Sequence, residues 1–315
     1  MKAEILVGDV TERLKELPDC SVQTCITSPP YWGLRDYGND GQLGLEKTPE
    51  EYVANMVAVF TEVWRVLADD GTLWLNLGDS YAGSGKGRNA DGTHSVSGKK
   101  QGTNRGSVEG ILTKTNTIGL KSKDLVGIPW RLAFALQSAG WYLRQDIIWH
   151  KPNPMPESVT DRCTKSHEYV FLLSKKPKYF FDSEAMKEPA LYPNDNRGSR
   201  GDSRRGTSMN SMSGATGTHR NKRDVWTIST KPFKGAHFAV MPEALVEPCI
   251  LAGSKPNDLV LDPFAGSGTV GVVALRQGRN FVGIELNPDY AELAFDRIKD
   301  DAPLFNEIRL DEGES

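Results

Sequence analysis

Short apolar runs, which predict β-strands, alternate along this chain with longer segments in which apolar residues recur every three or four positions, the spacing of a helix. The strands are expected at residues 2–7, 22–27, 72–77, 141–150, 168–174, 259–261 and 281–284. Strands that alternate with helices predict an α/β fold, with a mostly parallel sheet and helices on both faces. In such a sheet, ligands bind beyond the carboxyl ends of the strands.

Helix signals separate these strands. The longest helix is expected after Thr48, because Thr48 and Glu51 form a capping box with Pro49 at the first helical position. Its apolar residues continue at helical spacing to Leu67, and Asp70-Gly71 is predicted to end it. Other helices are expected at about residues 11–17 and 125–139, and after the turns at 266–268 and 287–288.

The composition is that of an ordinary globular protein. The chain has 315 residues, of which 38% are hydrophobic and 25% charged, and residues 1–315 are expected to form a single domain. No apolar run approaches the roughly 18 to 20 residues of a membrane span, and the N-terminus lacks the features of a secretory signal. We therefore expect a cytoplasmic protein. Its four cysteines lack metal-ligand spacing, so we expect buried thiols and no metal site.

Two stretches are basic, although the net charge of the chain is −3. The first covers about residues 82–124, and the second covers about residues 192–234 and includes Arg204 and Arg205. Lysine and arginine release condensed counterions when they meet phosphates, so both stretches suit a polyanion partner. Solvated surface loops of no particular function explain the same composition.

A glycine-rich turn follows the strand that is predicted to end near Asp262. Gly266, Gly268 and Gly271 satisfy the Gly-x-Gly-x-x-Gly pattern, and Glu285 at the end of the next strand is placed to bind ribose hydroxyls. Enzymes that use nicotinamide dinucleotides share this pattern. A carboxylate at Asp262 argues against them, because it would repel a pyrophosphate and would pair with the ammonium group of S-adenosylmethionine.

Two segments, "TSPPYWG" at 27–33 and "LDPFAGSGT" at 261–269, together resemble the motifs of DNA amino-methyltransferases. These enzymes transfer a methyl group from S-adenosylmethionine to the exocyclic nitrogen of cytosine or adenine. Because the Ser-Pro-Pro-Tyr segment comes early and the cofactor turn late, the order resembles the circularly permuted class called beta. The similarity covers nearly the whole chain and implies a Rossmann-like methyltransferase fold, S-adenosylmethionine as the cofactor and double-stranded DNA as the substrate.

The resemblance assigns a catalytic role to the Ser-Pro-Pro-Tyr segment. The Ser28 hydroxyl and the Pro29 carbonyl would accept the hydrogens of the target amino group, whose lone pair is otherwise delocalised into the ring. The consecutive prolines, Pro29 and Pro30, fix φ near −65° and remove competing N–H donors. Tyr31 would stack on a base flipped out of the duplex. Methyl transfer would then be direct displacement, which explains why no thiol or histidine lies beside the motif.

The resemblance also suggests binding residues elsewhere in the chain. For the cofactor these are Asp9, Phe238, Pro242, Asp262, Phe264, Gly266, Gly268, Thr269, Glu285 and Asn287. For DNA and the target base they are Trp149, Lys151, Asn153, Arg204 and Arg205, the last two within the candidate target-recognition segment. Some have structural alternatives: a turn at Asp9, a helix N-terminus at Pro242, and a strand end with a proline-rich turn at residues 149–153.

The identity of the base rests on Ser28. In the resembling family, serine before Pro-Pro-Tyr is usual for cytosine-N4 enzymes, whereas aspartate or asparagine is usual for adenine-N6 enzymes. We therefore expect N4-methylcytosine, with N6-methyladenine as the alternative. A carbon-5 mechanism would need a nucleophilic cysteine, but Cys249, which follows a proline, lies among apolar residues and is expected to be a buried core thiol.

Other classes of protein fit less well. The intact Ser-Pro-Pro-Tyr segment argues against a non-catalytic DNA-binding relative, and the late cofactor turn argues against RNA or protein amino-methyltransferases. The resemblance implies a bacterial, archaeal or phage-encoded protein. It leaves open a cognate restriction endonuclease as a partner, and a homodimer.

Overall fold

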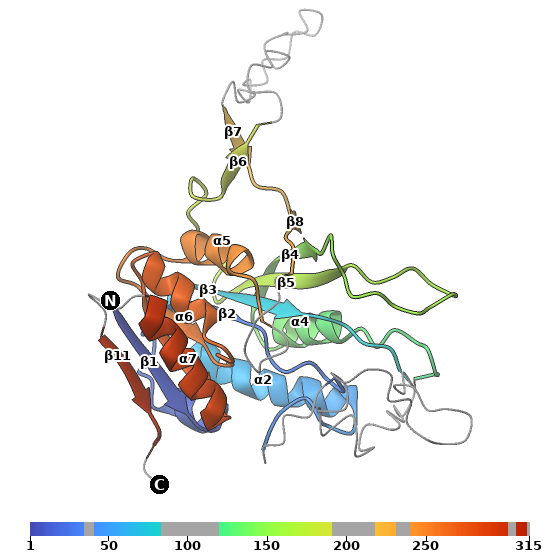
Figure 1. The fold of residues 1–315 in the computed structure, drawn as a ribbon, viewed down its shortest axis with the longest axis horizontal. Helices are drawn as coiled ribbons and strands as arrows, with labels where there is room; N and C mark the ends of the chain where they lie inside the picture. The colour runs from blue at the N-terminus through green and yellow to red at the C-terminus, as the bar shows by residue number, and fades with distance from the viewer. Residues whose placement is uncertain (35–40, 83–119, 191–217, 231–239, 302–306, 314–315) are drawn as a thin grey trace, which may run out of the picture.

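A nine-stranded sheet forms the centre of the protein in the computed structural model, which describes residues 1–34, 41–82, 120–190, 218–230, 240–301 and 307–313 (Figure 1). The strand order is β11-β1-β10-β9-β2-β3-β5-β4-β8. β5 runs antiparallel to its neighbours β3 and β4, and every other neighbouring pair in this order is parallel. The strands are β1 (Lys2–Val7), β2 (Val22–Thr27), β3 (Leu67–Leu77), β4 (Tyr142–His150), β5 (His167–Ser174), β8 (Val225–Thr227), β9 (Leu259–Asp262), β10 (Asn280–Glu285) and β11 (Glu307–Asp311).

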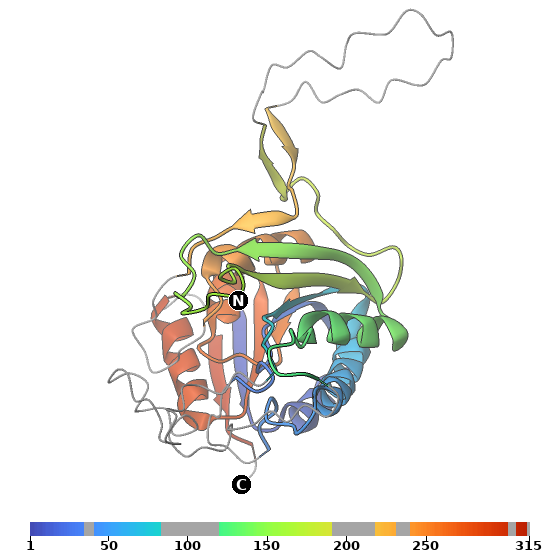
Figure 2. The same cartoon turned by 90° about the vertical axis from the view of Figure 1, so that its right-hand side faces the viewer.

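Helices cover both faces of this sheet, as the alternating pattern predicts (Figure 2). One face carries α1 (Val10–Lys15), α2 (Pro49–Val66) and α4 (Ile128–Ser138), and the other carries α5 (Glu243–Gly253), α6 (Thr269–Arg276) and α7 (Pro288–Asp301). Each layer has its own apolar core, represented by Phe60 and Leu132 on the first face and by Ile250 and Val273 on the second. The α/β architecture expected from the sequence is therefore confirmed.

A two-stranded ribbon projects from the sheet (Figure 1). It consists of β6 (Lys187–Pro189) and β7 (His219–Asn221), which pair antiparallel. The ribbon flanks residues 191–217, which lie outside the described residues, so only residues 218–230 of the candidate target-recognition segment are described. Of the first basic stretch, the structure describes residue 82 and residues 120–124.

The boundary between α2 and β3 differs from the prediction. The helix ends at Val66 and the strand begins at Leu67, whose backbone is extended, rather than after Asp70-Gly71. The cause is pairing with β2: Leu67 lies opposite Val22, and the ladder resumes only at Thr72 after a register shift. Residues 68–71 therefore form an irregularity within a strand, a feature that helical spacing alone does not reveal.

The topology brings several strand ends to one edge of the sheet. The carboxyl ends of β1, β2, β3, β4, β9 and β10 lie there because these strands run in the same direction. β5 runs the opposite way, so it contributes its amino end, with Tyr169 beside Leu77 of β3. Side chains that are far apart in the sequence thus meet at this edge.

At Gly271, α6 packs closely against its neighbours behind that edge. A Cβ there would lie 2.8 Å from ring atoms of Phe281 and 2.5 Å from Ile298 Cδ1. We expect Gly271→Ala to lower the free energy of unfolding by about 1–3 kcal/mol, because this core has no room for another carbon. At an exposed helix position the same change would raise the free energy of unfolding by roughly 1 kcal/mol. The sign of the change, measured by urea denaturation, therefore distinguishes a tightly packed position from an exposed one. Unchanged or increased stability would contradict the packing described.

Candidate active site at the carboxyl ends of the strands

Asp262, the last residue of β9, is a buried carboxylate with 2% of its surface exposed. Its Oδ1 accepts hydrogen bonds from the Thr27 hydroxyl at 2.7 Å and from the Phe264 backbone N–H at 3.1 Å. Burial raises the pKa of Asp262 to about 7, although both hydrogen bonds favour the ionised form. The fold therefore keeps a carboxyl group at this edge at a substantial desolvation cost.

Glu285, the last residue of β10, is a second mostly buried carboxylate. Its Oε2 accepts from the Gly266 N–H at 2.8 Å, and its Oε1 accepts from the Asn287 N–H at 3.0 Å. Burial raises its pKa despite these two bonds. Its backbone carbonyl accepts from the Gly8 N–H at 2.9 Å, which ties the ends of β10 and β1 together. One side chain thus shapes both the glycine-rich turn and the start of α7.

The glycine-rich turn leads from β9 into α6. Gly266 and Gly268 have φ values of 52° and 72°, in the left-handed region that glycine adopts without strain. A Cβ at Gly268 would lie 2.9 Å from Ala294 Cβ, so the turn also needs glycine for close packing against α7. Thr269 is buried, and its hydroxyl accepts from Arg297 at 2.8 Å. The pattern predicted at Gly266 and Gly268 is therefore a real strand–turn–helix connection.

The segment at Ser28–Tyr31 directly follows β2. Because Thr27 bonds to Asp262, this segment lies beside the end of β9. The Pro30 carbonyl accepts from the buried Tyr52 hydroxyl of α2 at 2.9 Å. Among the described residues, no donor bonds to the Pro29 carbonyl. The segment is thus anchored at Pro30 and leaves the carbonyl of the preceding residue as an acceptor.

Tyr31 is held at both its hydroxyl and its ring. The hydroxyl donates to Glu168 Oε2 at 2.8 Å, with Asn76 Oδ1 at 3.2 Å, and it accepts from the Ser28 hydroxyl at 3.3 Å. The ring lies against Gly78, where a Cβ would lie 2.7 Å from Tyr31 Cε2. Burial raises the pKa of Tyr31 well above its usual value, so the phenol keeps its proton at neutral pH.

Sequence reasoning missed Asn76 and Glu168. Asn76 is the polar residue of an otherwise apolar strand segment, "LWLNL" at 73–77, and Glu168 follows His167 directly before the apolar run "YVFLL" at 169–173. A polar residue inside an apolar strand is a recognisable signal, because burial requires it to have a partner. Without the pairing of β3 with β5, however, nothing in the sequence indicates that these two residues face Tyr31.

The three residues at and just after the end of β4 that were predicted to lie near the base have different surroundings. Trp149 is 3% exposed, and its indole N–H donates to the Ile228 carbonyl at 2.8 Å. Asn153 exchanges two hydrogen bonds with the backbone of Thr230, at 3.1 and 3.0 Å. Both side chains therefore tie the end of β4 to the segment after β8. Lys151 reaches the site itself, because it forms an ion pair with Glu168 while its ammonium lies 4.2 Å from the centre of the Trp149 ring.

The remaining predicted residues lie at the margin of the site or outside the described part. Asp9 is exposed and caps α1, accepting from the backbone of Thr11 and Glu12 at 2.8 and 3.1 Å. Pro242 is buried at the N-terminus of α5. Residues outside the described part are Phe238, Arg204 and Arg205.

The cysteines are only partly as expected. Cys25 and Cys249 are buried, and burial raises the pKa of the Cys249 thiol, whose Sγ donates to the Leu245 carbonyl at 3.3 Å. Cys249 is therefore a core thiol, as expected. Cys20 and Cys163 are exposed, so the expectation of burial is wrong for them; both lie in connections at the surface and not in strands or helices. In the described ranges, no group of three or more His, Cys, Asp or Glu could hold a metal ion.

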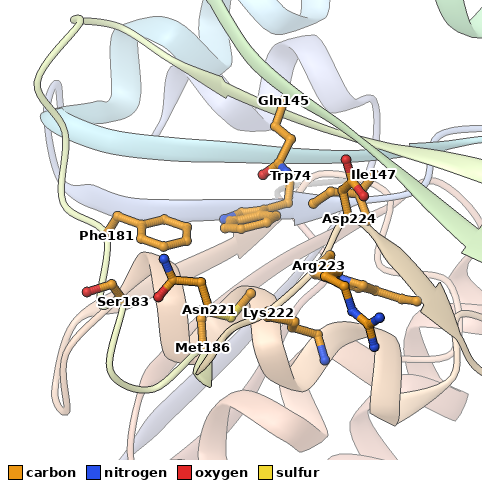
Figure 3. A pocket seen from close by; sticks show the side chains of 11 residues that line it. Trp74, Gln145, Ile147, Phe181, Ser183, Met186, Asn221, Lys222, Arg223 and Asp224 are labelled. Carbon is orange, nitrogen blue, oxygen red and sulfur yellow. The ribbon is translucent and has the colours of Figure 1, made fainter. Parts of the chain in front are cut away.

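A pocket of about 220 Å³ lies away from these strand ends, near the base of the β6–β7 ribbon (Figure 3). Aromatic side chains form one part of its lining, and Trp74 and Phe181 lie side by side there, 6.4 Å between ring centres. Residues 221–224, which include the end of β7, form another part. Neither carboxylate of the candidate site lines it.

Comparisons with known proteins agree with one another. A family model described as DNA methylase, covering N6 and N4 enzymes, matches residues 22–296. The chain is 48% identical over 298 residues to the type II methyltransferase M.Cfr9I of Citrobacter freundii, covering 94% of this chain and 88% of that protein. It is 49% identical over 295 residues to M.SmaI of Serratia marcescens, with coverage of 94% and 90%.

Solved structures share the fold at lower identity. A putative DNA modification methylase from Thermus thermophilus, complexed with S-adenosyl-L-methionine, is 24% identical with a TM-score of 0.62 and coverage of 99% of both chains. The cytosine-N4-specific PvuII DNA methyltransferase is 20% identical, also with a TM-score of 0.62, covering 99% of this chain and 95% of that one. In the described part of this chain, no helix is long and apolar enough to cross a bilayer.

The raised pKa of Asp262 predicts a pH-dependent difference in stability. In the unfolded chain this carboxyl has its ordinary pKa of 3.8, whereas in the folded chain it holds its proton up to about pH 7. The folded state therefore binds the extra proton, and its contribution to stability is lost as pH rises through about 7. Asp262→Asn keeps an acceptor oxygen for Thr27 and does not ionise.

We expect Asp262→Asn to be more stable than the wild type by on the order of 4 kcal/mol at about pH 8. The difference should shrink steadily as the pH is lowered toward about 4. Urea denaturation of both proteins over this range measures it. A difference in unfolding free energy that does not change with pH would contradict the burial described for Asp262.

Proposed function

Because the chain belongs to the DNA methylase family of N6 and N4 enzymes, we propose that it transfers the methyl group of S-adenosyl-L-methionine to the exocyclic N4 of a cytosine flipped out of duplex DNA. The observation that carries the proposal is the bond from Thr27 to Asp262. It sets the Ser28–Tyr31 segment beside Asp262, and β10 with Glu285 is the next strand beyond β9. Groups suited to a cofactor and groups suited to a base therefore share one edge of the sheet.

The carboxylates fit S-adenosylmethionine well. When bound, this cofactor supplies a methyl group on a positively charged sulfur. Both described hydrogen bonds to Asp262 reach Oδ1, and the other oxygen is the one that would pair with an ammonium group. A cation would restore the ionised form that burial now disfavours. Glu285 would bind ribose hydroxyls, and the turn at 266–268 would let the backbone approach the cofactor closely.

Residues around the turn would complete the cofactor site. Phe264 is half-buried and lies two residues after Asp262, and Asn287 precedes α7 near Glu285. Thr269 contributes through its contact with Arg297 and holds the start of α6 in place. Asp9 and Pro242, at two helix N-termini, are placed at its margin.

The Ser28–Tyr31 segment would receive the target base. An exocyclic amino group is a poor nucleophile, because its lone pair is delocalised into the ring. The Ser28 hydroxyl and the Pro29 carbonyl are acceptors for its two hydrogens, which would favour a pyramidal nitrogen. The Tyr31 ring would stack on the base, a contact worth about 1–3 kcal/mol in comparable sites. Alignment of the nitrogen with the methyl group then supplies most of the rate acceleration.

Two observations favour cytosine over adenine. Serine precedes Pro-Pro-Tyr in this chain, and one structure with the same fold is a cytosine-N4-specific enzyme. A short hydroxyl suits the amino group of a single ring, whereas a longer carboxyl or amide would serve adenine. Methylation of adenine N6 is the second candidate, since Ser28 could accept an adenine hydrogen after a small displacement.

DNA would also contact segments outside the site. We propose that the candidate target-recognition segment, about 192–234, binds the duplex with Arg204 and Arg205, and that the basic stretch at about 82–124 adds phosphate contacts. Lys151 would contribute from the end of β4, beside Trp149 and Asn153, which hold its backbone. The similarity to type II methyltransferases favours a cognate restriction endonuclease as a partner in the cell, where we expect the protein in the cytoplasm, as a monomer or a homodimer.

The product nucleoside tests the proposal. We expect duplex DNA incubated with the protein and S-adenosylmethionine to yield N4-methylcytosine after enzymatic digestion and mass spectrometry. Ser28→Ala should lower the yield at least about tenfold, because one acceptor for the amino hydrogens is lost. Cys249→Ser should retain most of the activity, since that thiol lies in the core.

The same measurement separates the alternatives. N6-methyladenine as the sole product would overturn the choice of base and leave the site as described. 5-Methylcytosine, with loss of activity in Cys249→Ser, would instead point to attack by a thiolate. DNA without any methylated base, from a protein that binds S-adenosylmethionine, would contradict the proposed function.

A further inference from the structure

Glu168, the second residue of β5, is a partly buried carboxylate that has no role in the proposed methyl transfer. Its side chain is 16% exposed. It contacts three polar side chains from three other segments: the Tyr31 hydroxyl, the Asn76 amide and the Lys151 ammonium group. A carboxylate with three polar partners at the edge of a site is a candidate for a functional role.

The position of Glu168 follows from the direction of β5. Because β5 is antiparallel to both neighbours, its amino end lies beside the carboxyl ends of β3 and β4. Glu168 pairs with Trp149 in β4, two residues before Lys151, while the next residue, Tyr169, pairs with Leu77 in β3. One side chain can therefore reach the Tyr31 segment and the segment that follows β4.

The two carboxylate oxygens have separate partners. Oε2 accepts from the Tyr31 hydroxyl at 2.8 Å and from Asn76 Nδ2 at 3.3 Å, whereas Oε1 pairs with Lys151. Asn76 is itself fixed, since its amide also donates to the Tyr169 carbonyl at 3.0 Å. The hydroxyl of Tyr31 therefore bonds to a group that cannot easily move.

Gly78 restricts the tyrosine ring from the side. A Cβ at this position would lie 2.7 Å from Tyr31 Cε2 and 3.3 Å from Glu168 Oε1, so the ring and the carboxylate both occupy space next to the glycine. The ring is therefore held at its hydroxyl by Glu168 and lies against Gly78 at its Cε2 atom.

We propose that Glu168 is a positioning residue that orients the Tyr31 ring for the target base. The ion pair with Lys151 neutralises the carboxylate, so this anchor places no uncompensated negative charge where a DNA strand would approach. The inference rests on the proposed function only through the stacking role of Tyr31. The contact between Glu168 and Tyr31 itself is a feature of the folded protein without DNA.

A double-mutant cycle tests the inference. The variants are Glu168→Ala, Tyr31→Phe and the combination, with Glu168→Gln retaining an acceptor oxygen for the hydroxyl. Glu62→Ala is the matched control, because Glu62 is a partly buried glutamate that pairs with Arg65 on α2. The measurements are kcat for methyl transfer to duplex DNA and the Kd of S-adenosylmethionine.

We expect Glu168→Ala to lower kcat by about tenfold or more, the loss typical of a hydrogen bond to a charged group. The Kd should stay within about twofold, Glu168→Gln should recover most of the loss, and Glu62→Ala should change neither constant. In the Tyr31→Phe background, removing Glu168 should lower kcat further by less than about twofold, since its partner is already absent. The inference would be overturned if the loss of kcat in the double variant equalled the product of the losses in the two single variants. An unchanged kcat in Glu168→Ala would also overturn it.

A second readout does not require methyl transfer. In protein labelled with 3-fluorotyrosine, Tyr31→Phe assigns the ¹⁹F resonance of Tyr31. Glu168→Ala should shift that resonance, whereas Glu62→Ala should leave it in place. Absence of methylated DNA from the wild-type protein would refute the proposed function alone, while an unmoved Tyr31 resonance in Glu168→Ala would refute the positioning role alone.

Discussion

The buried hydrogen bond from Thr27 to Asp262 links the two halves of the site. Its partners are 235 positions apart in the sequence, yet the oxygen atoms lie 2.7 Å apart because β2 and β9 are neighbours in the sheet. Ser28 follows the donor, and the glycine-rich turn follows the acceptor. Without this contact, the strand ends that lead into the segment proposed to receive the base and into the turn proposed to receive the cofactor would lose the hydrogen bond between their side chains.

The site also depends on keeping charged groups out of water. Asp262 and Glu285 both have raised pKa values because burial outweighs the hydrogen bonds that favour their ionised forms. Such carboxylates lower the stability of the folded chain at neutral pH, and a bound cation would relieve that penalty. Glu168 differs from these two carboxylates, because the ammonium group of Lys151 neutralises its charge within the protein. The first two therefore suit a ligand, and the third suits a fixed framework.

Much of this arrangement could be predicted from local patterns. Asp262 and Glu285 end apolar runs, and Ser28 directly follows one. Because parallel strands place their carboxyl ends at one edge of the sheet, the α/β fold class already predicts that these three residues lie at the same edge. Thr27, Asn76 and Glu168 were not predicted, because their roles depend on which strands pair and in which direction. The irregularity at residues 68–71 was missed for the same reason: its cause is the ladder with β2. The predictions at Phe238, Arg204 and Arg205 concern residues outside the described part of the chain.

The protein is proposed to methylate an amino group of a DNA base at this edge of the sheet. The most direct measurement is modification-sensitive long-read sequencing of DNA from a host without its own methyltransferases that expresses either the wild-type chain or the variant Asp262→Ala. The account predicts an amino-methylated base at one position of a single recurring sequence with the wild type and its absence with the variant. Unmodified DNA in cells that contain folded wild-type protein, or equal modification by the variant, would contradict it.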